Sequence, residues 1–287
     1  MIYLISALTC SILIMTGFKL FPRFKISITQ AITTNYLTAA TLGFITLQKS
    51  VDIQFFTNNE WSTTALISGV LLIVVFNIFA LSAEKAGVAI TAVSSKMSVI
   101  IPVLLGALIF GESFGFFKII GLILVLLSFW LIFKKKEGYK IKGALIILPL
   151  LLFLGNGTND SILKYAQFNF ITSDQGYVHY LTVAFTVSLI LGILIICVRF
   201  LMKKEQFKFK NILAGIILGV LNWYSTLFFL KGLGQMDVSI FIPIFNAGLV
   251  FSASIVGILG FKEPFSKINL LGIIMSIIAI TIIAYAN

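Results

Sequence analysis

The chain has 287 residues, of which 59% are hydrophobic and only 11% are charged, and its mean hydropathy is +1.09. A soluble domain carries about 25% charged residues, so this composition excludes a water-soluble globular protein. The net charge of +11 comes from short basic clusters between apolar runs, such as Lys134–Lys136 and Lys203–Lys204. That pattern is typical of membrane-protein loops and argues against a nucleic-acid partner.

The first apolar run extends from Ile2 to about Gly17 and has no basic region before it, so it predicts a membrane helix and not a removable signal peptide. Lipid offers the backbone no hydrogen-bond partners, and this requires helices through the bilayer. The sequence therefore predicts an all-α integral membrane protein with ten transmembrane helices. The other nine runs lie at about 29–47, 63–83, 88–110, 116–133, 144–166, 177–200, 211–231, 238–260 and 267–286.

The basic residues are distributed unequally between the connections. The odd-numbered connections hold sixteen, whereas the even-numbered ones hold only Lys49, Lys118, Lys164 and Lys231. Because short loops rich in Lys and Arg stay in the cytoplasm, the odd connections are expected there and both termini outside. The expected location is the cell (cytoplasmic) membrane, with the bilayer itself as a partner.

An internal repeat relates the two halves of the chain. Each half has a small-residue-rich apolar helix, a Glu-bearing hairpin and a closing apolar helix. An offset of 151 residues aligns Gly106 with Gly257, Glu112 with Glu263, Phe114 with Phe265 and Gly121 with Gly272. Five helices per half is an odd number, so the second half must be inserted upside down. The sequence predicts two inverted five-helix repeats, 1–138 and 139–287.

The two hairpins read "GESF" and "KEPF", and each joins the fourth to the fifth helix of its half. With the stretches at 83–112 and 240–264, this pattern resembles the drug/metabolite transporter (DMT) superfamily of the EamA type along essentially the whole chain. The resemblance implies carrier-type transport of small metabolites, often export, around a central cavity lined by the third, fourth, eighth and ninth helices. It also implies cytoplasmic termini, opposite to the orientation that the basic residues predict.

Lys96 is the strongest candidate for a substrate-binding residue. It lies about nine residues into the predicted helix 88–110, and an ionisable side chain at such depth costs about 2.5–3.5 kcal/mol on insertion scales. A lysine facing a cavity would attract a carboxylate or phosphate. The alternative is a structural lysine that reaches the headgroups or donates to helix carbonyls.

A second polar cluster occupies 155–161 in the predicted sixth helix, where no large apolar side chain occurs. This run could be a locally unwound helix that exposes carbonyls to a substrate. Alternatively, Asp160 and Lys164, four residues apart, neutralise each other on one helix face. Asn156 lies a turn deeper and is the better candidate for a cavity residue.

Single amides and aromatics complete the predicted substrate-binding set, which is Lys96, Asn77, Asn156, Asn222, Tyr224 and Asn246. Taken one at a time, membrane amides more often bond to a neighbouring helix than to a ligand. Their convergence on one cavity would favour binding. Asn246 and Ala247 occupy roughly the place of Lys96 in the second half, so any site is chemically asymmetric.

Two further groups have a structural interpretation. Glu112 and Glu263 are expected to cap the start of the helix that follows each hairpin. His179, the sole histidine, lies between Tyr177 and Tyr180, which is typical of an interfacial aromatic belt.

These patterns predict a secondary-active carrier with an anionic or amphipathic small-molecule substrate. They are compatible with either a monomer or a homodimer. The alternatives are a membrane-embedded enzyme acting on a lipid-linked substrate, or a flippase for lipid-linked sugars with the same fold. The single histidine and the absence of catalytic or nucleotide motifs argue against catalytic residues, a metal or a cofactor.

Overall fold

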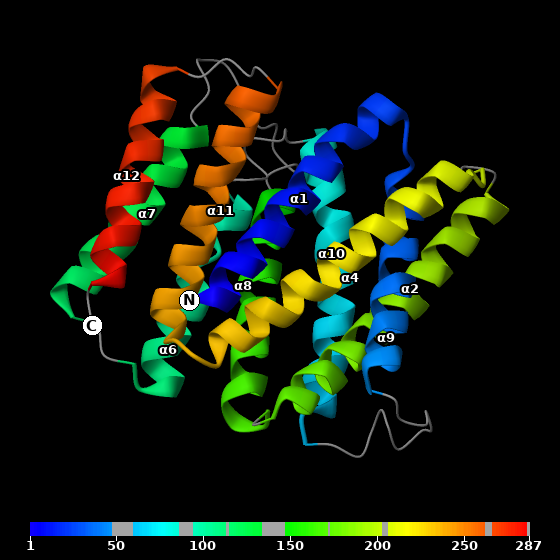
Figure 1. Ribbon diagram of the computed structural model, residues 1–287, viewed down its shortest axis with the longest axis horizontal. Coiled ribbons are helices and arrows are strands. Elements are labelled where there is room, and N and C mark those ends of the chain that lie inside the picture. Colours follow the sequence, from blue (N-terminus) through cyan, green and yellow to red (C-terminus); the bar gives the residue numbers. More distant parts are fainter. Residues whose placement is uncertain are drawn as a thin grey trace. The chain divides into compact units, whose positions relative to one another are not determined.

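The computed structural model describes residues 1–47, 60–85, 94–112, 115–133, 147–171, 173–202, 206–261 and 266–285. Ten α-helices form in this part of the chain, which confirms the all-α prediction (Figure 1). They are α1 (Ile2–Phe24), α2 (Ile28–Leu47), α4 (Ser62–Lys85), α6 (Ile100–Phe110), α7 (Phe116–Phe133), α8 (Ile147–Asn169), α9 (Asp174–Leu201), α10 (Phe209–Leu233), α11 (Val238–Phe261) and α12 (Lys267–Ala284).

Several of these helices are suited to a lipid bilayer by length and composition. Among the described residues, four stretches are long and apolar enough to cross it, and four shorter apolar helical stretches accompany them. The long stretches are Ile2–Phe24, Ser62–Phe79, Asp174–Leu201 and Phe209–Leu233. The chain is a multi-pass membrane protein.

The first helix continues well beyond Gly17, where the sequence suggested that it ends. The additional turns place Phe18 and Phe21 in an apolar cluster with Ala31 and Leu218, so their burial favours a longer helix. The helix ends at Lys25, whose φ of 51° is left-handed.

The predicted helix 88–110 is interrupted in the structure. Residues 94–97 are helical, Ser98 and Val99 form a turn, and α6 starts at Ile100; residues 88–93 lie outside the described part. Pro102 explains the break, because it has no N–H for the Ser98 carbonyl and its ring crowds that carbonyl. The Ser98 carbonyl instead accepts a hydrogen bond from the Ile101 N–H, at 3.0 Å.

The run 155–161, by contrast, is not unwound, because α8 is continuous through it. Its polar side chains bond within the helix: the Asn156 amide donates to the Leu152 carbonyl at 3.0 Å, and the Ser161 hydroxyl donates to the Gly157 carbonyl at 2.6 Å. Gly157 is needed for packing, since a Cβ there would collide with the Ile101 side chain of α6.

The contacts divide the chain into two compact units, each of which combines segments from both sequence halves. Unit 1 comprises Met1–Ile73 and Tyr165–Gly234, and unit 2 comprises Val74–Lys164 and Gln235–Asn287. The division falls within α4 and α8 and follows contacts, whereas the repeats 1–138 and 139–287 follow a sequence offset. The boundary between the repeats therefore stays a prediction.

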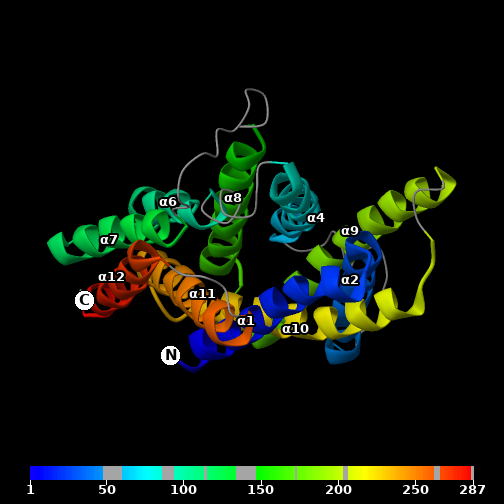
Figure 2. The same cartoon turned by 90° about the horizontal axis from the view of Figure 1, so that it is seen from above.

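Within unit 1, α2 packs against α9 and α10, and α1 packs against α10 (Figure 2). The Thr33 hydroxyl donates to the Gly192 carbonyl at 3.2 Å, while ten residues further along α2 Gly43 faces Thr182. Contacts that advance along one helix and retreat along the other mean that α2 and α9 are antiparallel. These are the second helices of the two halves.

Unit 2 repeats this relationship with other helices, because α7 packs against α12 and α6 packs against α11. Gly121 faces Ile283, and the Asn269 amide donates to the Leu131 carbonyl at 3.0 Å, so α7 and α12 are antiparallel. Each pair joins corresponding helices of the two halves. A two-fold axis in the bilayer plane requires such helices to run antiparallel, as an inverted repeat predicts.

Candidate functional site

Two of the predicted site residues, Lys96 and Asn246, are bonded to each other in unit 2. The Lys96 ammonium donates to the Asn246 side-chain oxygen at 3.1 Å. Lys96 is on the short helical segment just before the break at Ser98, and Asn246 lies on α11 with only 6% of its surface exposed. The bond therefore links the fourth helix of one half to the fourth helix of the other.

Asn156 joins the same cluster from α8. Its amide donates to the Ser95 hydroxyl at 3.3 Å, and Ser95 precedes Lys96. Three of the six predicted residues thus come together from three separate segments. Ser95 is an additional member that the sequence did not single out for binding.

Asp160 supplies a negative charge beside Lys96. It lies about one turn beyond Asn156 on α8, and its carboxylate and the Lys96 ammonium attract each other electrostatically. The expected neutralisation by Lys164 is therefore not the main interaction of Asp160. Lys164 is attracted to Glu112 and Asp237, and its ammonium lies 5.8 Å from the centre of the Phe110 ring.

Asn159, the residue before Asp160, contributes an unused acceptor. Its side-chain oxygen is buried and has no hydrogen-bond partner among the described residues. A buried acceptor left unpaired costs about 1–3 kcal/mol, so a ligand that donates a hydrogen bond there would recover that energy.

The remaining three predicted residues lie on α4 and α10. Asn77 is half-buried on α4 within unit 2. Asn222 and Tyr224 belong to unit 1, where the Thr226 hydroxyl donates to the Asn222 backbone carbonyl at 2.9 Å. Tyr224 is 44% exposed and stacks on Phe228, with ring centres 6.0 Å apart. The binding role of these three residues stays a prediction.

The aromatic residues near His179 pack together within unit 1, and their place at a membrane interface stays a prediction. The His179 ring meets Trp61 edge-on, with ring centres 4.8 Å apart, and Trp61 also contacts Tyr180. In the same unit Trp223 is buried against Phe185, so its ring serves packing.

The chemistry of the unit 2 cluster is suited to binding. It offers one cation, one anion, three amides and a hydroxyl, all of which can hold a polar solute by hydrogen bonds and charge. The described part of the chain contains no group of three or more His, Cys, Asp or Glu side chains placed to hold a metal ion.

These helices, with their apolar surfaces and a charged cluster inside one unit, define a multi-pass membrane protein with an internal polar cluster. The profile of the EamA-like transporter family matches residues 165–285. A Haemophilus influenzae protein, named only as an uncharacterized protein, is 31% identical over 295 residues, covering 99% of this chain and 98% of that protein. The chain belongs to the EamA-like transporter family of the DMT superfamily, whose members are membrane transporters.

A solved crystal structure has the same fold at low sequence identity. It is 12% identical, has a TM-score of 0.75, and the match covers 98% of this chain and 94% of the other. At this identity the likeness concerns the fold alone.

Proposed function

We propose that the protein is a secondary-active carrier of small polar metabolites that alternates access around the Lys96 cluster and exports its substrate. The Lys96–Asn246 hydrogen bond carries this proposal, since it joins nearly equivalent positions of the two halves. In inverted-repeat carriers the substrate site lies near mid-membrane, where the repeats meet. The energy would come from a gradient of solute or protons.

The charges in the cluster narrow the class of substrate. A lone lysine would favour a simple anion, but Asp160 offsets its charge. A solute that carries both an anionic and a cationic group could pair with both side chains at once. Binding would then replace one set of charge interactions by another. No buried charge would be left unpaired, and the free-energy cost of an unpaired buried charge would be avoided.

The same exchange suggests how the substrate engages the site. Its anionic group would take the place of the Asn246 oxygen at the Lys96 ammonium, and its cationic group would approach Asp160. The turn at Ser98 and Val99 separates the Lys96 segment from α6, so this segment can shift without bending α6. Broken helices of this kind frequently form the sites of secondary transporters.

The test uses purified protein in sealed liposomes loaded with three labelled solutes of matched size: a carboxylate, an amine and an amino-carboxylate. We expect efflux of the amino-carboxylate to exceed that of the other two, without chemical change. The Lys96→Met variant should lower its apparent affinity by about 10- to 150-fold, because a hydrogen bond to a charged group contributes about 1.5–3 kcal/mol.

Lys231→Met is the matched control, because Lys231 forms an ion pair with Asp174 in unit 1. It should transport like the unmodified protein. Equal efflux with Lys96→Met and with the unmodified protein would contradict the proposed site. A chemically altered solute would support the membrane-enzyme alternative.

A further inference from the structure

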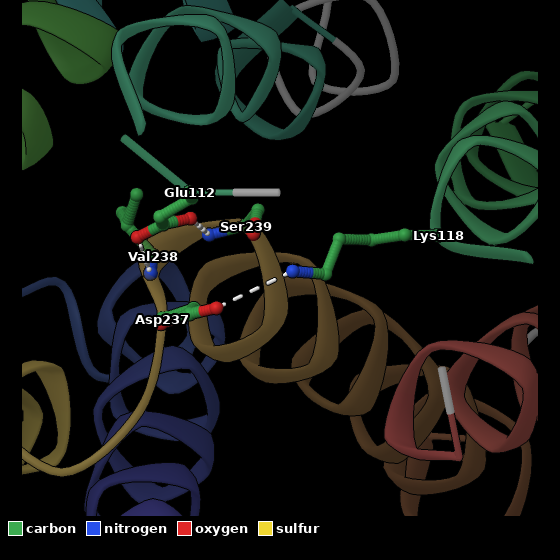
Figure 3. A network of polar contacts seen from close by, with 5 residues as sticks. All are labelled: Glu112, Lys118, Asp237, Val238 and Ser239. Atoms are coloured by element: carbon green, nitrogen blue, oxygen red, sulfur yellow. Dashed lines mark hydrogen bonds and ion pairs between the residues drawn. The ribbon is translucent and has the colours of Figure 1, made fainter. Parts of the chain in front are cut away.

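Glu112 caps a helix of the opposite half, and not the helix that follows its own hairpin as the sequence suggested. Its carboxylate accepts hydrogen bonds from the Val238 N–H at 2.7 Å and the Ser239 N–H at 2.9 Å (Figure 3). These are the first two residues of α11, whose N–H groups have no partner within the helix. A negative charge at this end also favours the helix dipole.

The turn at the end of α6 directs Glu112 towards α11. Gly111 has a left-handed φ of 65°, and the Gly106 carbonyl accepts the Glu112 N–H at 3.1 Å. Gly106 also leaves room for the contact, since a Cβ there would collide with Val238 and the Glu112 carboxylate. Gly106 and Gly111 thus both allow the contact between Glu112, in the first half, and α11, in the second half.

An ion pair lies beside this cap. The Lys118 ammonium, on α7, lies 3.3 Å from an Asp237 carboxylate oxygen, one residue before α11 (Figure 3). The Lys118 side chain is 3% exposed and that of Asp237 is 48% exposed. Lys164 is attracted to both Glu112 and Asp237, so two acids and two lysines gather where α11 begins.

The opposite end of the repeat lacks the residues for this ion pair. Under the offset of 151 residues, Lys118 corresponds to Asn269 and Asp237 corresponds to Ala86, although Glu112 corresponds to Glu263. Asn269 is used in the capping box of α12 with Ser266. In sequence, the two ends therefore share the glutamate but differ at the positions of Lys118 and Asp237.

We propose that Glu112, Lys118 and Asp237 form an ionic latch, which holds α11 against α6 and α7 and biases the resting carrier towards closure at this end. The proposal rests on the carrier function proposed above. Opening this end would separate the carboxylate of Glu112 from two N–H groups and Lys118 from Asp237. At the other end the offset places Asn269 and Ala86 at these two positions, and these residue types cannot form an ion pair with each other, so the latched end should be closed for more of the time.

The experiment measures access to the site from each side of the membrane, without any substrate. Cys10 and Cys197 are replaced by Ala, Ser95 is replaced by Cys as a reporter in the cluster, and an impermeant maleimide is added to right-side-out and to inside-out vesicles. The latch lies in an even-numbered connection, which the basic residues predict to be external. Asp237→Asn should increase labelling from the latch side by about two- to fivefold and decrease it from the other side.

Lys118→Met should redistribute labelling in the same direction, and Asp174→Asn serves as the matched control. Asp174 is paired with Lys231 at 2.9 Å and is 77% exposed, so its loss removes an ion pair without touching the latch. Unchanged labelling in both latch variants would overturn the proposal, and so would an equal increase from both sides, which marks general loosening. Because labelling needs no substrate, this result is independent of whether the liposome assay detects transport.

Discussion

Replacing Asp160 by Asn should lower the free energy of unfolding of the protein. The substitution keeps the size of the side chain but removes the negative charge next to Lys96. Lys96 and Asp160 attract each other electrostatically, and removing one of two neighbouring opposite charges leaves the other without compensation, which costs about 3–5 kcal/mol when the two form a buried pair. Lys96 keeps its hydrogen bond to Asn246, so we expect a loss in the lower part of that range.

The double variant separates this explanation from a simple packing defect. Lys96→Met alone leaves the Asp160 carboxylate unpaired and should cost a similar amount of free energy. When both changes are combined, no unpaired charge remains, and replacing a whole buried pair is often nearly neutral. The free energy of unfolding of the double variant should therefore exceed that of either single variant, by about 2 kcal/mol or more.

The measurement is denaturant unfolding in detergent micelles, followed by the fluorescence of the three tryptophans. Asp174→Asn serves again as the control, since an exposed ion pair contributes only about 0–1 kcal/mol. Losses that add up in the double variant would refute the Lys96–Asp160 pairing, because independent sites behave additively.

Two further substitutions test the helix contacts of unit 1. Gly219→Ala should lower the free energy of unfolding by about 1–3 kcal/mol, because its Cβ would meet the Asn35 carbonyl of α2, whereas Gly17→Ala has space and should have little effect. Asn211→Ala should cost about 1–3 kcal/mol, because its buried amide donates to Gln30 at 2.8 Å. The same denaturant titration checks both, and a Gly219→Ala variant as stable as Gly17→Ala would contradict the close approach of α10 to α2.

The helical architecture could be predicted from the sequence because hydropathy is a local property. Each apolar run has to form its own hydrogen bonds in lipid, so the runs predict the helices almost directly. The break before α6 was missed, although Pro102 is visible in the sequence and has a known effect on the carbonyl four residues earlier. The run 88–110 is apolar along most of its length, so its hydropathy gives no indication of the helix break.

The site could be predicted only in part, because contacts between distant helices are not encoded locally. Depth in the membrane made Lys96 a candidate from the sequence alone, and the structure shows it bonded to Asn246. The sequence did not indicate a charge partner for Lys96: one interpretation paired Asp160 with Lys164, four residues along the same helix, whereas the structure places Asp160 within electrostatic reach of Lys96 on another segment. A better rule pairs the deepest opposite charges first, because an isolated charge at that depth costs most.

Glu112 shows the same limitation. A glutamate just before a helix is a familiar cap for that helix, and the sequence alone did not identify Val238 as its hydrogen-bond partner. The left-handed Gly111 was the available signal, since glycine after a helix commonly reverses the chain. Its effect on a distant helix required the packing of α6 against α11.

The chemical asymmetry of the halves has a physical origin in the inverted repeat. Side chains near a two-fold axis face their own counterparts, so a lysine at both equivalent positions would place two like charges within a few ångströms. At about 4 Å their repulsion would be about 4 kcal/mol at an effective dielectric constant of 20. The chain avoids this, because Ala247 stands where the offset places the counterpart of Lys96, and Lys96 bonds to the adjacent Asn246. A charged group near the axis of such an inverted repeat therefore requires that the two halves differ there, and in the proposed carrier this difference would allow the two ends to close with different stability.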